Sequence, residues 1–248
     1  MASTTEAADH GQEGGHGKWG PWLQHHFETP SQQFSSAKLG MWAFLAQEVL
    51  FFSGLFVAYF VFRFLYPEAF EAGSAQLNRF IGAFNTCVLL ISSFTAAMAV
   101  RSSQLGQKNP TSIYLVITIV CALAFLVIKY FEYKAKFDHG LLPGEYWAPD
   151  LSHVHPWGSM AAHAAEGAHH GVAALPPKTH IFFAIYFMLT GLHGVHVAVG
   201  IGVLVWILVR NMRGEFSRQY FTPVDIVALY WHLVDLVWIF LFPLLYLI

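Results

Sequence analysis

Five ionisable side chains lie within long apolar stretches of this chain and could take part in proton or hydrogen-bond chemistry. They are Glu48, His193, His196, His232 and Asp235. An ionisable residue at the centre of a bilayer costs about 2.5–3.5 kcal/mol on insertion scales, so it needs a polar partner and is a candidate for a functional site. His232 and Asp235 are three residues apart, which places them on one face of a helix. These residues therefore predict a buried polar network.

The composition defines the environment of these residues. Of the 248 residues, 56% are hydrophobic and only 11% are charged, whereas a soluble domain carries about 25% charged residues. A run of about 20 apolar residues is long enough to cross a bilayer as a helix. The sequence therefore predicts an all-α integral membrane bundle of five transmembrane helices, at residues 39–62, 80–100, 113–133, 181–209 and 226–248.

The distribution of basic residues predicts the orientation. The connection after the second span carries Arg101 and Lys108, and the connection after the fourth carries Arg210, Arg213 and Arg218. Lysine and arginine are enriched in cytoplasmic loops, so the N-terminus is expected inside and the C-terminus outside. The chain then divides into a polar cytoplasmic segment, residues 1–38, and a transmembrane domain, residues 39–248. That domain contains an extracytoplasmic loop at about residues 134–178.

The long loop is rich in Ala, Gly and His, and His153, His155, His163, His169 and His170 lie close together in the sequence. Histidine-rich tracts can bind zinc or copper. A solvated loop outside the membrane is the favoured interpretation, and no metal site is predicted. Cys87 and Cys121 have no metal-type spacing and are interpreted as small apolar residues.

The five buried ionisable residues are predicted to lie in one band of the membrane. A helix rises about 1.5 Å per residue, which places Glu48 and Asp235 roughly 14 Å from the inner edge of the membrane. By the same measure, His232 lies roughly 10 Å and His196 roughly 20 Å from that edge, and His193 lies deeper than His196. Such a network could relay protons, or it could hold helices together through hydrogen bonds. Both interpretations remain open, and the second is favoured. Haem ligation is disfavoured, because His193 and His196 share one helix and only His232 could face them.

Other residues are predicted to shape helix packing. Gly194, Ala198 and Gly202 recur every four residues, and small residues at this spacing allow close approach of a neighbouring helix. Asn85, within the second span, is expected to donate a hydrogen bond between helices. None of these residues is predicted to be catalytic.

Four segments, in this order, resemble the subunit III family of cytochrome c oxidase, part of the haem–copper respiratory oxidases. They begin at Glu48-Val49-Leu50, Phe84-Asn85-Thr86, the His-Gly-x-His motif of residues 193–196, and Tyr230-Trp231-His232. The last segment continues to Trp238, and Trp231 and Trp238 are expected to be structural. The resemblance covers residues 36–248, with the five-helix form of several bacterial oxidases rather than the seven-helix form.

The resemblance implies a non-catalytic subunit of a proton-pumping terminal oxidase in the bacterial inner membrane. Such a subunit binds no haem or metal itself, because haem and copper belong to its partners. It contacts subunit I, assembles with subunit II and other respiratory subunits, holds structural phospholipid and supports proton uptake. Glu48 corresponds to the family's carbodiimide-reactive glutamate, Arg210 to an arginine that contacts lipid phosphate, and Glu132 to a family acid of no assigned role.

Three alternatives remain. Quinol oxidases and nitric oxide reductase-associated complexes have a similar third subunit, and this chain does not reveal the electron donor. An independent proton-coupled transporter using Glu48 and Asp235 is a different class, and the internal repeats and interrupted helices common in transporters are not evident. No basic patch suggests nucleic acid.

Overall fold

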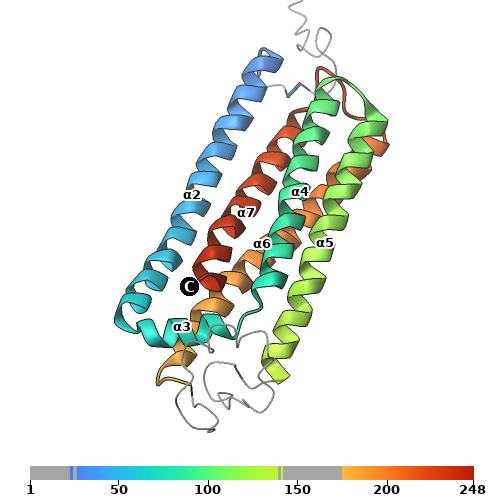
Figure 1. The fold of residues 1–248 in the computed structure, drawn as a ribbon. Helices are drawn as coiled ribbons and strands as arrows, with labels where there is room; N and C mark the ends of the chain where they lie inside the picture. The colour runs from blue at the N-terminus through green and yellow to red at the C-terminus, as the bar shows by residue number, and fades with distance from the viewer. Residues whose placement is uncertain (1–22, 25–26, 139–140, 142–174) are drawn as a thin grey trace, which may run out of the picture.

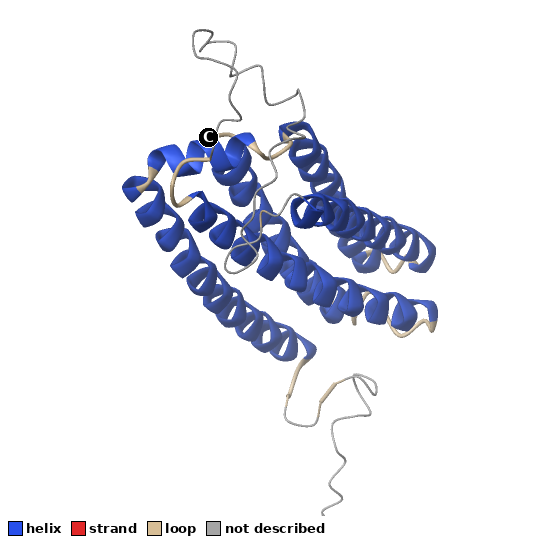
Figure 2. Ribbon diagram, turned by 90° about the horizontal axis from the view of Figure 1, so that it is seen from below, coloured by secondary structure: helices blue, strands red, loops and turns tan. Residues whose placement is uncertain are grey.

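The protein is a bundle of long helices in a computed structural model that describes residues 23–24, 27–138, 141 and 175–248. The described part contains helices and no strands (Figure 2). Five of its helices are long and apolar enough to cross a membrane: α2 (Pro30–Leu65), α4 (Arg79–Gln104), α5 (Lys108–Asp138), α6 (Thr179–Met212) and α7 (Thr222–Tyr246). This confirms the predicted all-α membrane bundle.

The helices begin and end where local chemistry permits. Thr29 caps α2 by accepting a hydrogen bond from the Gln32 amide, and Pro30 occupies the first turn. This cap starts α2 nine residues before the predicted span, inside the segment expected to be polar and outside the membrane. Asn78 caps α4 in the same way. Gly106 and Gly214 adopt positive φ in the turns that follow α4 and α6.

One helix was not predicted. The short α3 (Pro67–Ala75) lies across the end of the bundle (Figure 1). Its Phe70 packs edge-on against Tyr59 of α2 and Phe182 of α6, with ring centroids 5.4 Å apart in both pairs. Gly73 lies directly against the Phe182 ring. This helix therefore ties α2 to the start of α6.

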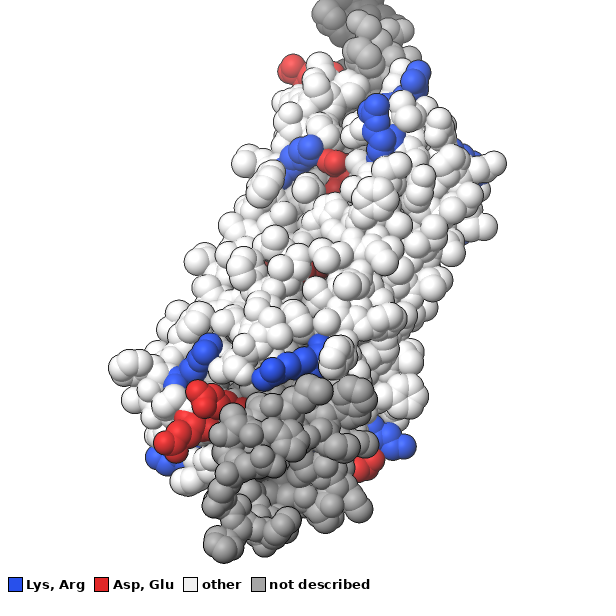
Figure 3. All heavy atoms as spheres, in the orientation of Figure 1, with Lys and Arg blue, Asp and Glu red and all other residues white. Residues whose placement is uncertain are grey.

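Charged side chains gather at the two ends of the bundle, separated by an apolar band with little charged surface (Figure 3). We call the end with the α4–α5 and α6–α7 connections the basic end, and the opposite one the α3 end. The chain is thus an integral membrane protein, and the prediction that the basic end is cytoplasmic still stands as a prediction.

The helix α2 touches the rest of the bundle along one narrow stripe. Its buried residues are Leu45, Phe52 and Tyr59, spaced by seven, which places them on one side of the helix. At the α3 end, the Tyr59 hydroxyl donates to the Leu244 carbonyl of α7. At the basic end, Lys38 of α2 pairs with Asp225 of α7 at 3.2 Å.

Candidate functional site

The first polar site joins α2 to α6 through Glu48 and His196. The Nε2 atom of His196 lies 3.0 Å from Glu48 Oε2, and Nδ1 lies 2.8 Å from the Leu192 carbonyl oxygen. A carbonyl only accepts, so Nδ1 must carry a hydrogen. The second contact then needs one more proton, either on Nε2 or on the Glu48 carboxyl. The pair therefore shares one proton inside the membrane.

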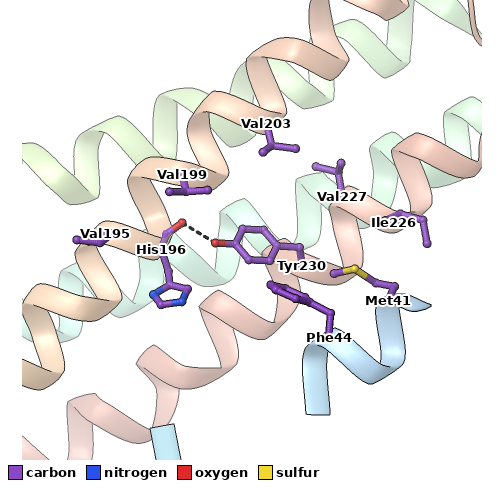
Figure 4. A pocket seen from close by; sticks show the side chains of 9 residues that line it. All are labelled: Met41, Phe44, Val195, His196, Val199, Val203, Ile226, Val227 and Tyr230. Carbon is purple, nitrogen blue, oxygen red and sulfur yellow. Dashed lines mark hydrogen bonds between the residues drawn. The ribbon is translucent and has the colours of Figure 1, made fainter. Parts of the chain in front are cut away.

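An apolar groove opens beside this pair, between α2, α6 and α7. Its volume is about 390 Å³. Figure 4 shows the lining side chains, with the Tyr230 hydroxyl donating to the His196 carbonyl across 3.0 Å. The lining consists of Met41, Phe44, Val195, His196, Val199, Val203, Ile226, Val227 and Tyr230. With so few polar groups, the groove suits a hydrocarbon chain.

Arg210 lies on the same side of α6 as the groove, near the basic end. Val199, Val203 and Arg210 are separated by four and seven residues, which keeps them on one helical face. The Arg210 Nε donates to Glu215 Oε2 at 2.6 Å. Its guanidinium also stacks over Trp206, 4.7 Å from the ring centroid. Arg210 is therefore held in place by Glu215 and Trp206 on the groove side of α6.

The second polar site is a buried ion pair near the α3 end, built from α5, α6 and α7. Glu132 accepts hydrogen bonds from Lys129 at 2.9 Å, from Tyr186 at 3.0 Å and from Tyr246 at 2.6 Å. The Lys129 Nζ also donates to both phenol oxygens, at 3.0 and 2.9 Å. All three ammonium hydrogens and both phenol hydrogens thus have acceptors, so the cluster is closed.

This cluster was not predicted from the sequence. Lys129 lies near the end of the predicted third span, where its long side chain could have extended toward the membrane surface, but it is only 7% exposed and points into the bundle. Glu132, a family acid of no assigned role, lies inside α5 and is 8% exposed. A lysine and an acid three residues apart on an apolar helix were the available signal. The two tyrosines, from distant helices, gave none.

His193 and Asn85 are buried with no hydrogen-bond partner among the described residues, and the buried Asp235 carboxyl has the Ser93 hydroxyl nearby. His193 packs against Trp238 and Phe125, with ring centroids 5.2 and 5.5 Å away. Within the described residues, neither of its ring nitrogens is hydrogen-bonded, nor are the side-chain polar atoms of Asn85. The predicted role of Asn85 as an interhelical donor therefore finds no acceptor in this part of the chain.

The five ionisable residues do not form one network in the described chain. Only Glu48 and His196 are bonded to each other. His232 instead pairs with Ser93 of α4, with Nδ1 2.7 Å from the hydroxyl oxygen. Two tryptophans of the segment from Tyr230 to Trp238 join α7 to α4. Trp231 donates a hydrogen bond to Ser92 at 2.9 Å, and Trp238 donates one to Thr86 at 3.1 Å.

Comparisons with known proteins identify the family. Residues 165–248 match the family model described as cytochrome c oxidase subunit III. Quinol oxidase subunit 3 of Bacillus subtilis is 31% identical over 215 residues, covering 84% of this chain and 85% of the relative. This chain belongs to the subunit III family of the haem–copper oxidases. A probable cytochrome c oxidase subunit 3 of Mycobacterium tuberculosis is 28% identical over 210 residues, covering 85% and 87%.

A third relative is named for two subunits, I and III, in one chain. The haem–copper oxidase subunit I+III of Aeropyrum pernix is 28% identical over 238 residues, covering 92% of this chain and 24% of the relative. Members of the family are subunits of multi-subunit oxidoreductases. Among the described residues of this subunit III, no three His, Cys, Asp or Glu side chains are grouped as metal ligands would be. The histidine-rich stretch of the long loop lies outside the described residues.

The small-residue face of α6 in this subunit III differs from the predicted packing. A methyl group added at Gly194 or Gly202 would meet no atom within 4 Å, and Ala198 is exposed. The close approach occurs at Gly200 instead, where an added Cβ would lie 2.8 Å from Trp231 Cζ3. Helices α6 and α7 therefore touch through Gly200, and the face with Gly194 and Gly202 is open in this chain.

Proposed function

We propose that this chain is the non-catalytic third subunit of a proton-pumping terminal oxidase that reduces O₂ to water in a bacterial inner membrane. The membership in the subunit III family carries the proposal. Haem and copper would reside in subunits I and II. The polar groups of this chain support a structural role, because the closed Lys129–Glu132 cluster and the Ser93–His232 contact use their donors and acceptors to join helices.

The direct partner would be subunit I. The fused relative from Aeropyrum pernix, named for subunits I and III, supports this assignment. Cytochrome c and quinol both remain candidate electron donors, because relatives of both kinds match over most of the chain.

A tagged chain purified in mild detergent tests the proposal. We expect it to bring with it a large membrane partner and haem, seen in a reduced-minus-oxidised spectrum. Oxygen consumption by the purified complex with reduced cytochrome c or with a quinol then identifies the donor. A chain that purifies alone and without haem would refute the assignment and favour an independent transporter.

We further propose that the apolar groove holds one acyl chain of a phospholipid whose phosphate pairs with Arg210. The lining is almost wholly hydrocarbon, and Arg210 lies on the same face of α6, seven residues or roughly 10 Å from Val203. Native mass spectrometry of the purified complex measures retained phospholipid. Filling the groove by Val199→Trp, or removing the charge by Arg210→Ala, should lose a bound lipid, whereas Val120→Trp on the outward face of α5 should retain it.

The Glu48–His196 pair would support proton uptake by subunit I indirectly, through the fit between the two subunits. Glu48→Gln keeps the shape of the pair and can still bond the imidazole. We expect the complex with this variant to assemble and respire with little loss. A loss of most oxygen consumption in an intact complex would mean that the shared proton is used in turnover.

A further inference from the structure

The helix α7 exposes a histidine within the apolar band. His232 is half-buried, and Ser93 of α4 holds its ring through Nδ1 at 2.7 Å. Within the described residues, the other ring nitrogen, Nε2, makes no hydrogen bond. In Figure 1, α7 lies between α2 and α4. One turn further along α7, Leu236 is 48% exposed, so His232 borders exposed surface of α7.

The depth of this histidine excludes the ends of lipid molecules as its partners. His232 is ten residues into α7, or roughly 15 Å along the axis, and 14 residues or roughly 21 Å from the other end. Lipid headgroups and ester groups lie near the two surfaces of a bilayer, and acyl chains offer no hydrogen bond. A polar group at this depth is normally covered by protein or lines a cavity.

The residues around His232 form a surface that a helix could cover. Leu236 and Ile239 follow at one and two helical turns and are 48% and 40% exposed. Leu90 of α4 is also 48% exposed. We call Leu90, His232, Leu236 and Ile239 the α7 face. An apolar surface with one polar group at its centre is typical of contacts between membrane helices.

The outward side of α5 provides a contrast within the same chain. Val116, Val120, Leu123 and Val127 are between 45% and 58% exposed at similar depth. These exposed side chains are all aliphatic, which suits contact with lipid. Both surfaces are exposed in the isolated chain. The α7 face contains the polar side chain of His232, whereas the named residues of the α5 surface are all apolar.

We propose that the α7 face packs against subunit I and that a hydrogen-bonding side chain of subunit I lies opposite Nε2 of His232. The proposal rests on the proposed function, which supplies the partner. The fused relative named for both subunits supports subunit I as the occupant rather than a second copy of this chain. The partner group can donate or accept, because the Ser93 hydroxyl can bond either tautomer of the ring.

Photocrosslinking in the assembled oxidase tests the location of the interface. The crosslinker p-benzoylphenylalanine replaces Leu236 or Ile239 in one pair of variants, and Val120 or Ala198 in a control pair. We expect a subunit I adduct, identified by mass spectrometry, from the first pair and no such adduct from the control pair. An adduct with subunit I from Val120 or Ala198, and none from the α7 face, would overturn the proposal. So would an adduct with a second copy of this chain at Leu236.

A second experiment tests the hydrogen bond itself. His232→Leu removes the polar group, whereas His232→Gln keeps a donor and an acceptor. We expect the leucine variant to lose subunit I at a lower detergent concentration than the original complex, and the glutamine variant to restore part of the resistance. If all three complexes lose subunit I at the same detergent concentration, the proposed hydrogen bond to His232 is refuted. If no oxidase partner purifies with the original chain, the proposed function fails instead, so the two failures are distinguishable.

Discussion

The buried cluster near the α3 end makes a sharp prediction about stability. Glu132→Gln removes the negative charge but leaves an oxygen that can still accept from Tyr186 and Tyr246. The atom facing Lys129 changes from an acceptor to an amide donor, so the 2.9 Å contact becomes unfavourable. Breaking a buried ion pair by removing one partner costs about 3–5 kcal/mol, because the remaining charge is buried alone.

A double-mutant cycle measures this pairing directly. Lys129→Met should also destabilise the chain, since it removes the charged hydrogen-bond donor to Glu132 and leaves the two phenol donors and the nearby charge of buried Lys136. The double variant contains neither charge, so we expect it to be at least as stable as either single variant. The measurement is the free energy of unfolding in mixed micelles titrated with dodecyl sulfate, followed by tryptophan fluorescence. Glu68→Gln, at an exposed position of α3, is the control, with an expected change within about 0.5 kcal/mol.

Two results would refute this reasoning. If Glu132→Gln behaves like the Glu68 control, the ion pair contributes nothing to the fold. If the losses of the two single variants add in the double variant, the two charges do not act as a pair. In both cases the closed hydrogen-bond arrangement would not be the reason that α5, α6 and α7 converge.

Two further predictions concern helix packing and the carboxyl group of α7. Gly200→Ala should destabilise the chain by about 1–3 kcal/mol, because the carbon of its new methyl group would lie only 2.8 Å from the Trp231 ring; Gly194→Ala has open space and should change the unfolding free energy by less than about 0.5 kcal/mol. Asp235→Asn should change stability by less than about 1 kcal/mol, because the amide has the same shape and its oxygen can still accept from the nearby Ser93 hydroxyl. A larger loss in the same unfolding assay would indicate that the carboxyl itself is required.

The sequence alone predicted the number and class of the membrane-spanning helices, but not all of their ends. Hydropathy is a property of consecutive residues, and five apolar runs are sufficient to predict five spans. The first helix nevertheless starts at Pro30, because a Thr29 cap extends it beyond the apolar run. The helix α3 was missed because nine residues of mixed polarity carry no periodic signal long enough to recognise.

The candidate sites were predicted as residue types, and only the tertiary structure decided their partners. Glu48 and His196 are both polar residues in apolar spans, but their 148-residue separation hides the contact between them. Lys129 could equally have extended to the membrane surface or turned inward. The physical reason is that polarity belongs to each residue, whereas a hydrogen bond depends on the rotation and tilt of two helices. Packing across several helices sets those angles, which no single stretch of sequence contains.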